Sequence, residues 1–274
     1  MPGRFPERIV CLTEETTETL YLLGEERRIV GISGFTVRPP RARREKPRVS
    51  AFTSAKIERI LELKPDLVLG FSDLQADIAA ELVRKGVNVH IFNQRSVQEI
   101  LDMIAMLSSM VGAAHAGELL VAQLEAGLEA IRAEAARFPK RPRVYFEEWD
   151  QPMISGIRWV SELVGIAGGD DVFPQRAQSP GASGRIVAER REVIDAQPDI
   201  IIGSWCGKKF RPEQLAARDG FADIPAVRDD QLFEVKSPLI LQPGPAALTD
   251  GVRALRRIVV QWQEAQSLPG IREG

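Results

Sequence analysis

Lys64-Pro65-Asp66-Leu67-Val68-Leu69-Gly70-Phe71 has a close counterpart in Gln197-Pro198-Asp199-Ile200-Ile201-Ile202-Gly203-Ser204-Trp205, in the other half of the chain. In both stretches, Pro-Asp ends a helix and starts a buried strand of branched side chains. The glycine lets the chain leave the strand tip sharply. The repeat predicts two similar α/β lobes, each with an aromatic residue at the strand end where open α/β sheets bind ligands. The alternative is a common helix–strand joint that recurs by chance.

The composition is that of a water-soluble globular chain. It has 274 residues, 44% of them hydrophobic, and a net charge of −2. This charge gives no general attraction to nucleic acid or to anionic membranes. No apolar run approaches the roughly 18 residues of a membrane span, and the amino terminus lacks the apolar segment of a secretory signal. We therefore expect a monomer that is not membrane-inserted, cytoplasmic as written or periplasmic if a leader precedes this sequence.

Strand and helix patterns alternate along the chain and divide it into three parts. Residues 1–112 form a predicted amino-terminal α/β lobe and residues 139–274 a carboxyl-terminal one. Between them, residues 113–138 predict one unbroken helix that joins the lobes, although a long helix inside one larger domain is the alternative. The predicted strands are Ile9–Leu12, Ile29–Ile32, Leu67–Gly70, Val87–Phe92, Val144–Phe146, Ile200–Ile202 and Leu232–Val235.

The sequence offers little for catalysis or metal binding. His90 and His115 have no ligand neighbours at metal-site spacing. Glu147 and Glu148 are adjacent in a strand and should point in opposite directions, so they make a poor acid–base pair. The chain also lacks a Walker loop, a G-x-S-x-G elbow and a dinucleotide fingerprint. These features predict no catalytic residues and no protein-built metal site.

Several short motifs follow one another in a specific order. They are Thr17-Glu18 before Leu22-Leu23-Gly24, Val30-Gly31-Ile32-Ser33, Arg38-Pro39-Pro40, Ile60 to Val68, Ser155-Gly156, Gly168 to Phe173, and Lys236-Ser237-Pro238. In this order and spacing, from about Arg8 to Trp262, the chain resembles the helical-backbone (class III) solute-binding proteins of ABC importers for cobalamin, haem and ferric siderophores. The cobalamin-binding branch is the most similar.

The resemblance implies two Rossmann-like lobes joined by a rigid helix, with the ligand held in the cleft between them. A flat, mostly apolar corrin needs large rigid aromatic faces and a few polar contacts. The matching positions are Phe35 and Phe71 on the first lobe and Trp149, Met153, Ser155 and Trp205 on the second. We expect these aromatics to be partly exposed in the empty protein. Trp159 and Trp262 lie on helical stripes and are expected in the core.

Polar contacts are also implied by the resemblance. Arg38, at the start of the basic loop, and Arg185 could meet amide, phosphate or carboxylate groups of a ligand, although such residues are often simply solvated. Importer-binding proteins dock on their permease through an acidic residue on each lobe. The corresponding residues are Asp77 on the first lobe and Asp219, or alternatively Asp223, on the second.

The leading hypothesis is therefore non-catalytic binding of cobalamin or a related corrinoid, with no built-in cofactor, for an ABC importer or in a cytoplasmic relative of one. Haem or a ferric siderophore is the alternative ligand, and a tetrapyrrole metal chelatase is the alternative from another class. A chelatase would need better-placed histidines. The connecting helix contains one glycine, Gly127, which weakens it by only about 1 kcal/mol relative to alanine. We therefore expect a small change in lobe angle on binding.

Overall fold

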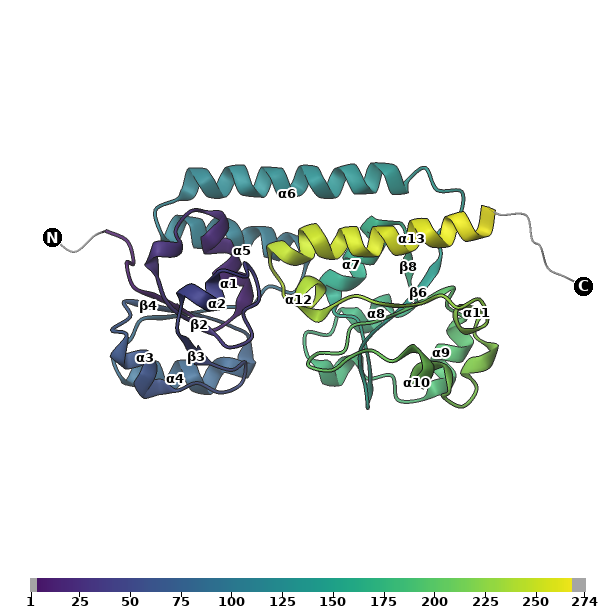
Figure 1. Ribbon diagram of the computed structural model, residues 1–274, viewed down its shortest axis with the longest axis horizontal. Coiled ribbons are helices and arrows are strands. Elements are labelled where there is room, and N and C mark those ends of the chain that lie inside the picture. Colours follow the sequence, from purple (N-terminus) through teal and green to yellow (C-terminus); the bar gives the residue numbers. More distant parts are fainter. Residues whose placement is uncertain (1–3, 268–274) are drawn as a thin grey trace, which may run out of the picture. The chain divides into compact units, whose positions relative to one another are not determined.

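A computed structural model describes residues 4–267 and separates the chain into two compact units (Figure 1). Unit 1 contains the residues up to Gln94, then Gln98–Glu125 and Gln242–Ala246. Unit 2 contains Arg95–Val97, Ala126–Leu241 and the residues from Ala247 onward. Each unit holds its own sheet, and the predicted α/β class is confirmed.

Unit 1 is built on a five-stranded parallel sheet in the order β3-β2-β1-β4-β5. Helices α3 and α4 lie on one face of this sheet and α1 lies on the other (Figure 1). The strands are β1 Ile9–Cys11, β2 Ile29–Ser33, β3 Arg48–Ser50, β4 Leu67–Phe71 and β5 Val89–Phe92. The helices in this part of the chain are α1 Glu14–Leu22, α2 Ala42–Glu45, α3 Ile57–Glu62, α4 Ala76–Arg84 and α5 Val97–Met110.

The core of unit 1 follows directly from strand alternation. Val10 and Val68 on neighbouring strands point to one face, where they pack against Ile60 of α3 and Leu82 of α4. All residues of β1 and β4 are buried, as is typical of the central strands of a parallel sheet covered on both faces.

Unit 2 has a sheet in the order β10-β9-β6-β7, in which β7 is antiparallel to β6 and β8 pairs with the start of β6. Helices α7 and α13 pack together in this unit. The strands are β6 Arg143–Asp150, β7 Met153–Ser155, β8 Asp170–Asp171, β9 Ile200–Gly203 and β10 Leu232–Glu234. The helices are α7 Arg158–Ala167, α8 Pro174–Ala177, α9 Arg190–Ala196, α10 Pro212–Ala216, α11 Pro225–Arg228, α12 Ser237–Ile240 and α13 Val252–Ser267.

The repeated Pro-Asp motif makes the same connection in both units. Asp66 accepts backbone hydrogen bonds from Glu7 (2.7 Å) and Arg8 (3.0 Å), directly before β1. Asp199 accepts one from the amide of Arg143 (2.8 Å), at the start of β6. In each case the aspartate holds the amino-terminal end of the neighbouring central strand. The predicted structural repeat is therefore confirmed at the level of individual hydrogen bonds.

The glycines of the two motifs have a different purpose from the one predicted. Gly70 lies within β4 and Gly203 is the last residue of β9, and neither has a positive φ angle. A Cβ atom on Gly70 would lie 2.6 Å from Gln75 Oε1, and one on Gly203 would lie 2.0 Å from the ring of Phe210. Both positions need glycine because another side chain packs directly on the backbone.

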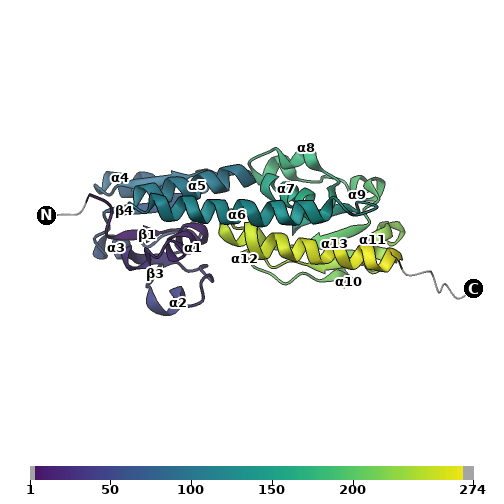
Figure 2. The same ribbon diagram turned by 90° about the horizontal axis from the view of Figure 1, so that it is seen from above.

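The predicted long helix is present as α6, Ala114–Ala135, and it is continuous (Figure 2). The boundary between the units falls within it, after Glu125. No helix among residues 4–267 combines the length and the apolar character needed to cross a bilayer.

Three short strands, β3, β7 and β8, were not predicted. Each has only two or three residues, which is too short for a period-two pattern to be detected.

Candidate ligand-binding surfaces

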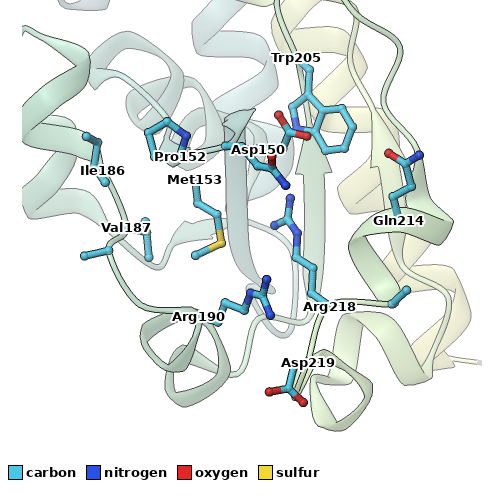
Figure 3. A pocket seen from close by; sticks show the side chains of 13 residues that line it. Asp150, Pro152, Met153, Ile186, Val187, Arg190, Trp205, Gln214, Arg218 and Asp219 are labelled. Carbon is cyan, nitrogen blue, oxygen red and sulfur yellow. The ribbon is translucent and has the colours of Figure 1, made fainter.

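A hollow of about 550 Å³ lies in unit 2, at the carboxyl ends of β6 and β9 (Figure 3). Met153, Trp205 and Arg218 line it, together with the acidic residues Asp150 and Asp219. Its volume is within the range of small-molecule sites. The hollow thus lies at the sheet edge that the sequence predicted, and it includes three residues named from the sequence, Met153, Trp205 and Asp219.

The wall of this hollow is held by a fully buried carboxylate. Glu147 accepts two hydrogen bonds from Arg218 (2.6 and 2.9 Å), one from Trp205 Nε1 (3.0 Å) and one from the Tyr145 hydroxyl (3.0 Å). Burial alone lowers the pKa of Arg218, but the hydrogen bonds and charge of Glu147 outweigh this, and the pKa is raised. Four donors satisfy Glu147, so it orients the Trp205 indole and is not available as a proton acceptor.

Two indoles near the hollow share one cation. The ammonium of Lys208 lies 4.6 Å from the ring centre of Trp149 and 4.9 Å from that of Trp205. It also forms an ion pair with Asp150 (2.5 Å). Trp149 is partly buried, and its Nε1 donates to the carbonyl of Gln151 (2.8 Å). This arrangement fixes both indoles at the ends of their strands.

Glu148 points away from Glu147 and makes a separate ion pair with Arg185. Arg185 is 4% exposed and also donates to the carbonyl of Ser155 (2.6 Å), while the Ser155 hydroxyl donates to the carbonyl of Arg185 (3.2 Å). Burial raises the pKa of Glu148, and the nearby Arg185 reduces this effect. The predicted opposite orientation of the two glutamates is confirmed. Ligand contact by Arg185 or Ser155 remains a prediction.

The strand ends of unit 1 present exposed apolar side chains. Phe35, which follows β2, is 56% exposed, and Leu74, which follows β4, is 58% exposed. Leu74 was not identified from the sequence, although it lies only three residues after Phe71, the aromatic at the end of β4.

Phe71 and Trp205 are more buried than expected, at 5% and 4% exposure respectively. Trp205 packs edge-to-face on Phe210 in the core of unit 2. The amide of Phe71 donates to Gln75 Oε1 (2.9 Å). Both residues were expected to be partly exposed, and for Trp205 the contacts with Phe210 and Glu147 explain the difference. Their role in ligand contact remains a prediction. Trp159 and Trp262 are 3% and 2% exposed, and their predicted core positions are confirmed.

Three buried carboxyl groups lie near the start of α1. Burial, followed by the charge of Glu15, raises the pKa of Glu14 to about 8, and burial raises that of Glu15 to about 7. Thr13 is the N-cap residue of α1, but its hydroxyl donates to Glu15 (2.6 Å) and makes no capping hydrogen bond to the helix backbone. Glu18 accepts from Arg38 (2.8 Å) and from the amide of Ala246 (3.0 Å). Arg38 is thus anchored to this acidic group.

Comparison with known proteins decides the family. Residues 9–239 match the family described as periplasmic binding protein. The chain belongs to the periplasmic binding protein family. This match confirms the resemblance indicated by the sequence motifs.

Several members of the periplasmic binding protein family are similar over most of their length. A vitamin B12-binding protein of Vibrio parahaemolyticus is 25% identical over 88% of this chain and 86% of its own. The crystal structure of the vitamin B12-binding protein of Vibrio cholerae is 25% identical, with a TM-score of 0.74 over 94% of this chain and 98% of its own. The haem-binding protein RhuT of Roseiflexus is 26% identical, with a TM-score of 0.78 over 92% and 99%.

The remaining residues named from the sequence lie at the surface or apart from one another. Asp77, in the first turn of α4, Asp219 and Asp223 are all exposed, as a docking surface for a permease requires. His90 lies in β5 and His115 in α6. Within residues 4–267, no group of three or more histidine, cysteine or acidic side chains is arranged to hold a metal ion.

Proposed function

We propose that this member of the periplasmic binding protein family binds cobalamin or a related corrinoid without catalysing a reaction, as the substrate-binding component of an ABC-type importer or as a cytoplasmic relative of one. The observation that carries the proposal is the fixed indole pair of Trp149 and Trp205 beside the hollow of about 550 Å³. Rigid aromatic faces suit the flat, largely apolar ring of a corrin. The vitamin B12-binding relatives support the same ligand class.

Each unit contributes to the proposed contact set. Phe35, Arg38 and Phe71 belong to unit 1, and Trp149, Met153, Ser155, Arg185 and Trp205 belong to unit 2. Exposed Phe35 and partly buried Trp149 can contact a ligand without rearrangement. Phe71 and Trp205 present little surface in the empty protein, so they contribute mainly by fixing the surface around them. Truncation of a true aromatic anchor costs on the order of 2–4 kcal/mol of binding.

Titration with cobalamin tests the proposal. Cobalamin should quench the fluorescence of Trp149 and Trp205 saturably, with one site per chain. Calorimetry should give the same stoichiometry, and it is not affected by the light that cobalamin absorbs. In Trp149→Phe the quenching amplitude should fall, whereas in Trp262→Phe, which removes a buried core indole, it should not. If neither cobalamin nor cobinamide gives quenching or heat while haem or a ferric siderophore binds, the corrinoid assignment is wrong.

Haem is the second candidate ligand, and the similarity to the haem-binding protein RhuT specifically favours it. Arg190 lines the hollow of unit 2 and can complement a carboxylate group, whereas Arg218 is already paired with Glu147. The visible spectrum separates the two ligands, because haem and cobalamin absorb differently and each spectrum changes on binding. Competition between them at one site would show which binds more tightly.

For the importer function, we propose that Asp77 and Asp219 bind a permease. Asp77→Arg should leave cobalamin affinity unchanged and should abolish stimulation of ATP hydrolysis by the cognate permease in proteoliposomes. Glu125→Arg, at an exposed position of α6, is the matched charge reversal. Equal stimulation by wild type and Asp77→Arg would contradict the proposed docking role. Asp219 lines the hollow of unit 2, so its variant must be checked for ligand binding first.

A further inference from the structure

A second hollow, of about 420 Å³, lies in unit 1 beside the edge strand β3. Its lining comes from the end of β2, from β3, from the following segment and from α3. Gly34, at the end of β2, is one of these residues, and it directly precedes the exposed Phe35. This hollow therefore adjoins the proposed aromatic contact of unit 1.

Three cations line the hollow: Arg48 of β3, Lys56, and Arg59 of α3. No acidic side chain is among the lining residues. Within residues 4–267, none of the three cations forms an ion pair or a side-chain hydrogen bond. Like charges that converge without a counter-charge raise the local positive potential and attract anions.

Several other arginines of unit 1 do have acidic partners. Arg28 pairs with Glu25 at 2.5 Å, and Arg38 with Glu18 at 2.8 Å. Arg41, in the same basic loop as Arg48, pairs with Glu26 at 3.2 Å. Arg48 is the arginine of this loop that lines the hollow, and within residues 4–267 it forms no ion pair.

The backbone keeps the hollow open at its junction with Phe35. The amide of Gly34 donates to the carbonyl of Ser50 (2.7 Å), and a Cβ atom at Gly34 would lie 3.1 Å from that oxygen. A larger residue there would therefore crowd β3. Ser50 and Ser54 add hydroxyl groups to the lining.

We propose that this hollow binds the oxyanion group of the ligand, a phosphodiester or a carboxylate, while Phe35 contacts its ring. Arginine presents a planar fork that matches both oxyanions, and Lys56 adds a point charge. A volume of about 420 Å³ accommodates an oxyanion attached to a larger organic group. The identity of the ligand rests on the proposed function, but the oxyanion site itself does not.

The first experiment tests the site without the ligand. In two-dimensional amide NMR, inorganic phosphate at constant ionic strength should shift Ala51, Ser54 and Lys56 in the wild type. The shifts should disappear in Lys56→Gln/Arg59→Gln and persist in Arg84→Gln, whose exposed cation ends α4 at the opposite edge of the sheet. All three side chains are exposed, so folding should be preserved, and equal melting temperatures would verify it. Absence of shifts, or equal shifts in the double variant, overturns the site.

The second experiment identifies the oxyanion. Cobinamide lacks the phosphodiester of cobalamin, and haem dimethyl ester lacks the free carboxylates of haem. For the pair that binds, the double variant should lower the affinity for the oxyanion-bearing ligand, cobalamin or haem, by about tenfold. This is the effect of losing roughly one charge-assisted hydrogen bond. The affinity for the ligand without the oxyanion, cobinamide or haem dimethyl ester, should fall by less than twofold. Equal effects on both members overturn the proposal. If no tetrapyrrole binds the wild type, the proposed function is wrong. The phosphate titration still shows whether the hollow binds an oxyanion.

Discussion

The two units bury carboxyl groups near the ends of their strands but balance the charge in different ways. In unit 2, Glu147 and Glu148 are each paired with an arginine, Arg218 and Arg185. In unit 1, burial raises the pKa of Glu14 to about 8 and that of Glu15 to about 7, and neither has an ion pair within residues 4–267. In unit 2, arginines therefore balance both glutamates, whereas in unit 1 only Glu18 has an arginine partner, Arg38, and burial favours the protonated forms of Glu14 and Glu15.

The aromatic residues follow the same division. In unit 2, Trp205 is locked by Glu147, Phe210 and Lys208. In unit 1, Phe35 is largely exposed after β2. A preorganised surface loses less entropy on binding, whereas an exposed aromatic can adapt to the ligand. We infer that the proposed contact residues of unit 2 are preorganised, whereas Phe35 of unit 1 can adapt to a ligand.

The largest expected effect is at the buried ion pair of unit 2. Arg218→Met removes two hydrogen bonds from Glu147, which is 0% exposed, and should lower the free energy of unfolding by about 3–5 kcal/mol. Arg38→Met in unit 1 should cost about 1 kcal/mol or less, because that pair is partly exposed and Glu18 keeps the amide of Ala246.

Urea unfolding can measure each unit separately. All four tryptophans, at positions 149, 159, 205 and 262, lie in unit 2, so their emission reports on that unit. Hydrogen exchange of β1 and β4 amides reports on unit 1. Glu147→Gln/Arg218→Met should recover part of the loss because it removes the unpaired charge. Equal losses for Arg218→Met and Arg38→Met would contradict the difference between the units.

Phe71 and Phe35 give the next comparison, within unit 1. Phe71→Ala removes a buried ring and should cost about 3–4 kcal/mol of stability. Phe35→Ala should change stability by less than about 0.5 kcal/mol and weaken ligand binding instead. Melting curves and calorimetric titration separate the two effects. Normal stability of Phe71→Ala would show that its ring is not part of the core.

The pH dependence of unit 1 has the opposite sign from that of most acidic residues. Burial raises the pKa of Glu14 from its ordinary value of 4.5 to about 8 in the folded state, so the folded protein retains a proton that the unfolded chain releases. The stabilisation is therefore complete below about pH 4.5 and is lost as the pH rises towards 8.

Glu14→Gln should accordingly reduce the fall in stability between pH 6 and 8.5 and should stabilise the protein at the upper end by on the order of 1–2 kcal/mol. Glu125→Gln, at an exposed helical position, is the control and should leave the profile unchanged. Denaturant unfolding at several pH values provides the measurement. A slope that persists in Glu14→Gln would exclude Glu14 as its source.

The smallest expected difference lies between the two Pro-Asp joints. Asp66→Ala removes two backbone hydrogen bonds and Asp199→Ala removes one. Each should cost about 1 kcal/mol or slightly more, with Asp66→Ala the larger of the two. Hydrogen exchange at the first residues of β1 and β6 would locate each loss. A purely global effect would show that the aspartates do not act on their neighbouring strands.

Sequence reasoning was successful where a pattern is local and repeated. The alternation of strands and helices, the Pro-Asp joints and the opposite orientation of Glu147 and Glu148 all follow from periodicity. It was less successful for side chains whose surroundings come from distant segments. Trp205 is buried because Glu147 and Phe210 meet there, and no spacing in the sequence indicates that contact.

Short edge strands were also difficult to predict from the sequence. Arg48–Ser50 forms β3, yet this stretch resembles the polar loop before it. Residues 48, 56 and 59 line the hollow beside β3. Their spacing in the sequence fits neither a helix nor a strand period, so the sequence did not indicate that they lie together. The residues proposed for ligand contact came from family resemblance, and ligand titration of their variants remains the way to test them.

The segment Gln242–Ala246 has a consequence for the order of events during biosynthesis. It belongs to unit 1, where Ala246 donates to Glu18 (3.0 Å) and Pro243 accepts from Gln94 (2.9 Å). A nascent chain that has not reached Ala246 cannot form these contacts, although all the strands of unit 1 have already been translated. Vectorial synthesis usually lets an amino-terminal domain fold first. Here the half that leaves the ribosome first can be completed only after all the strands of unit 2 have also been synthesised.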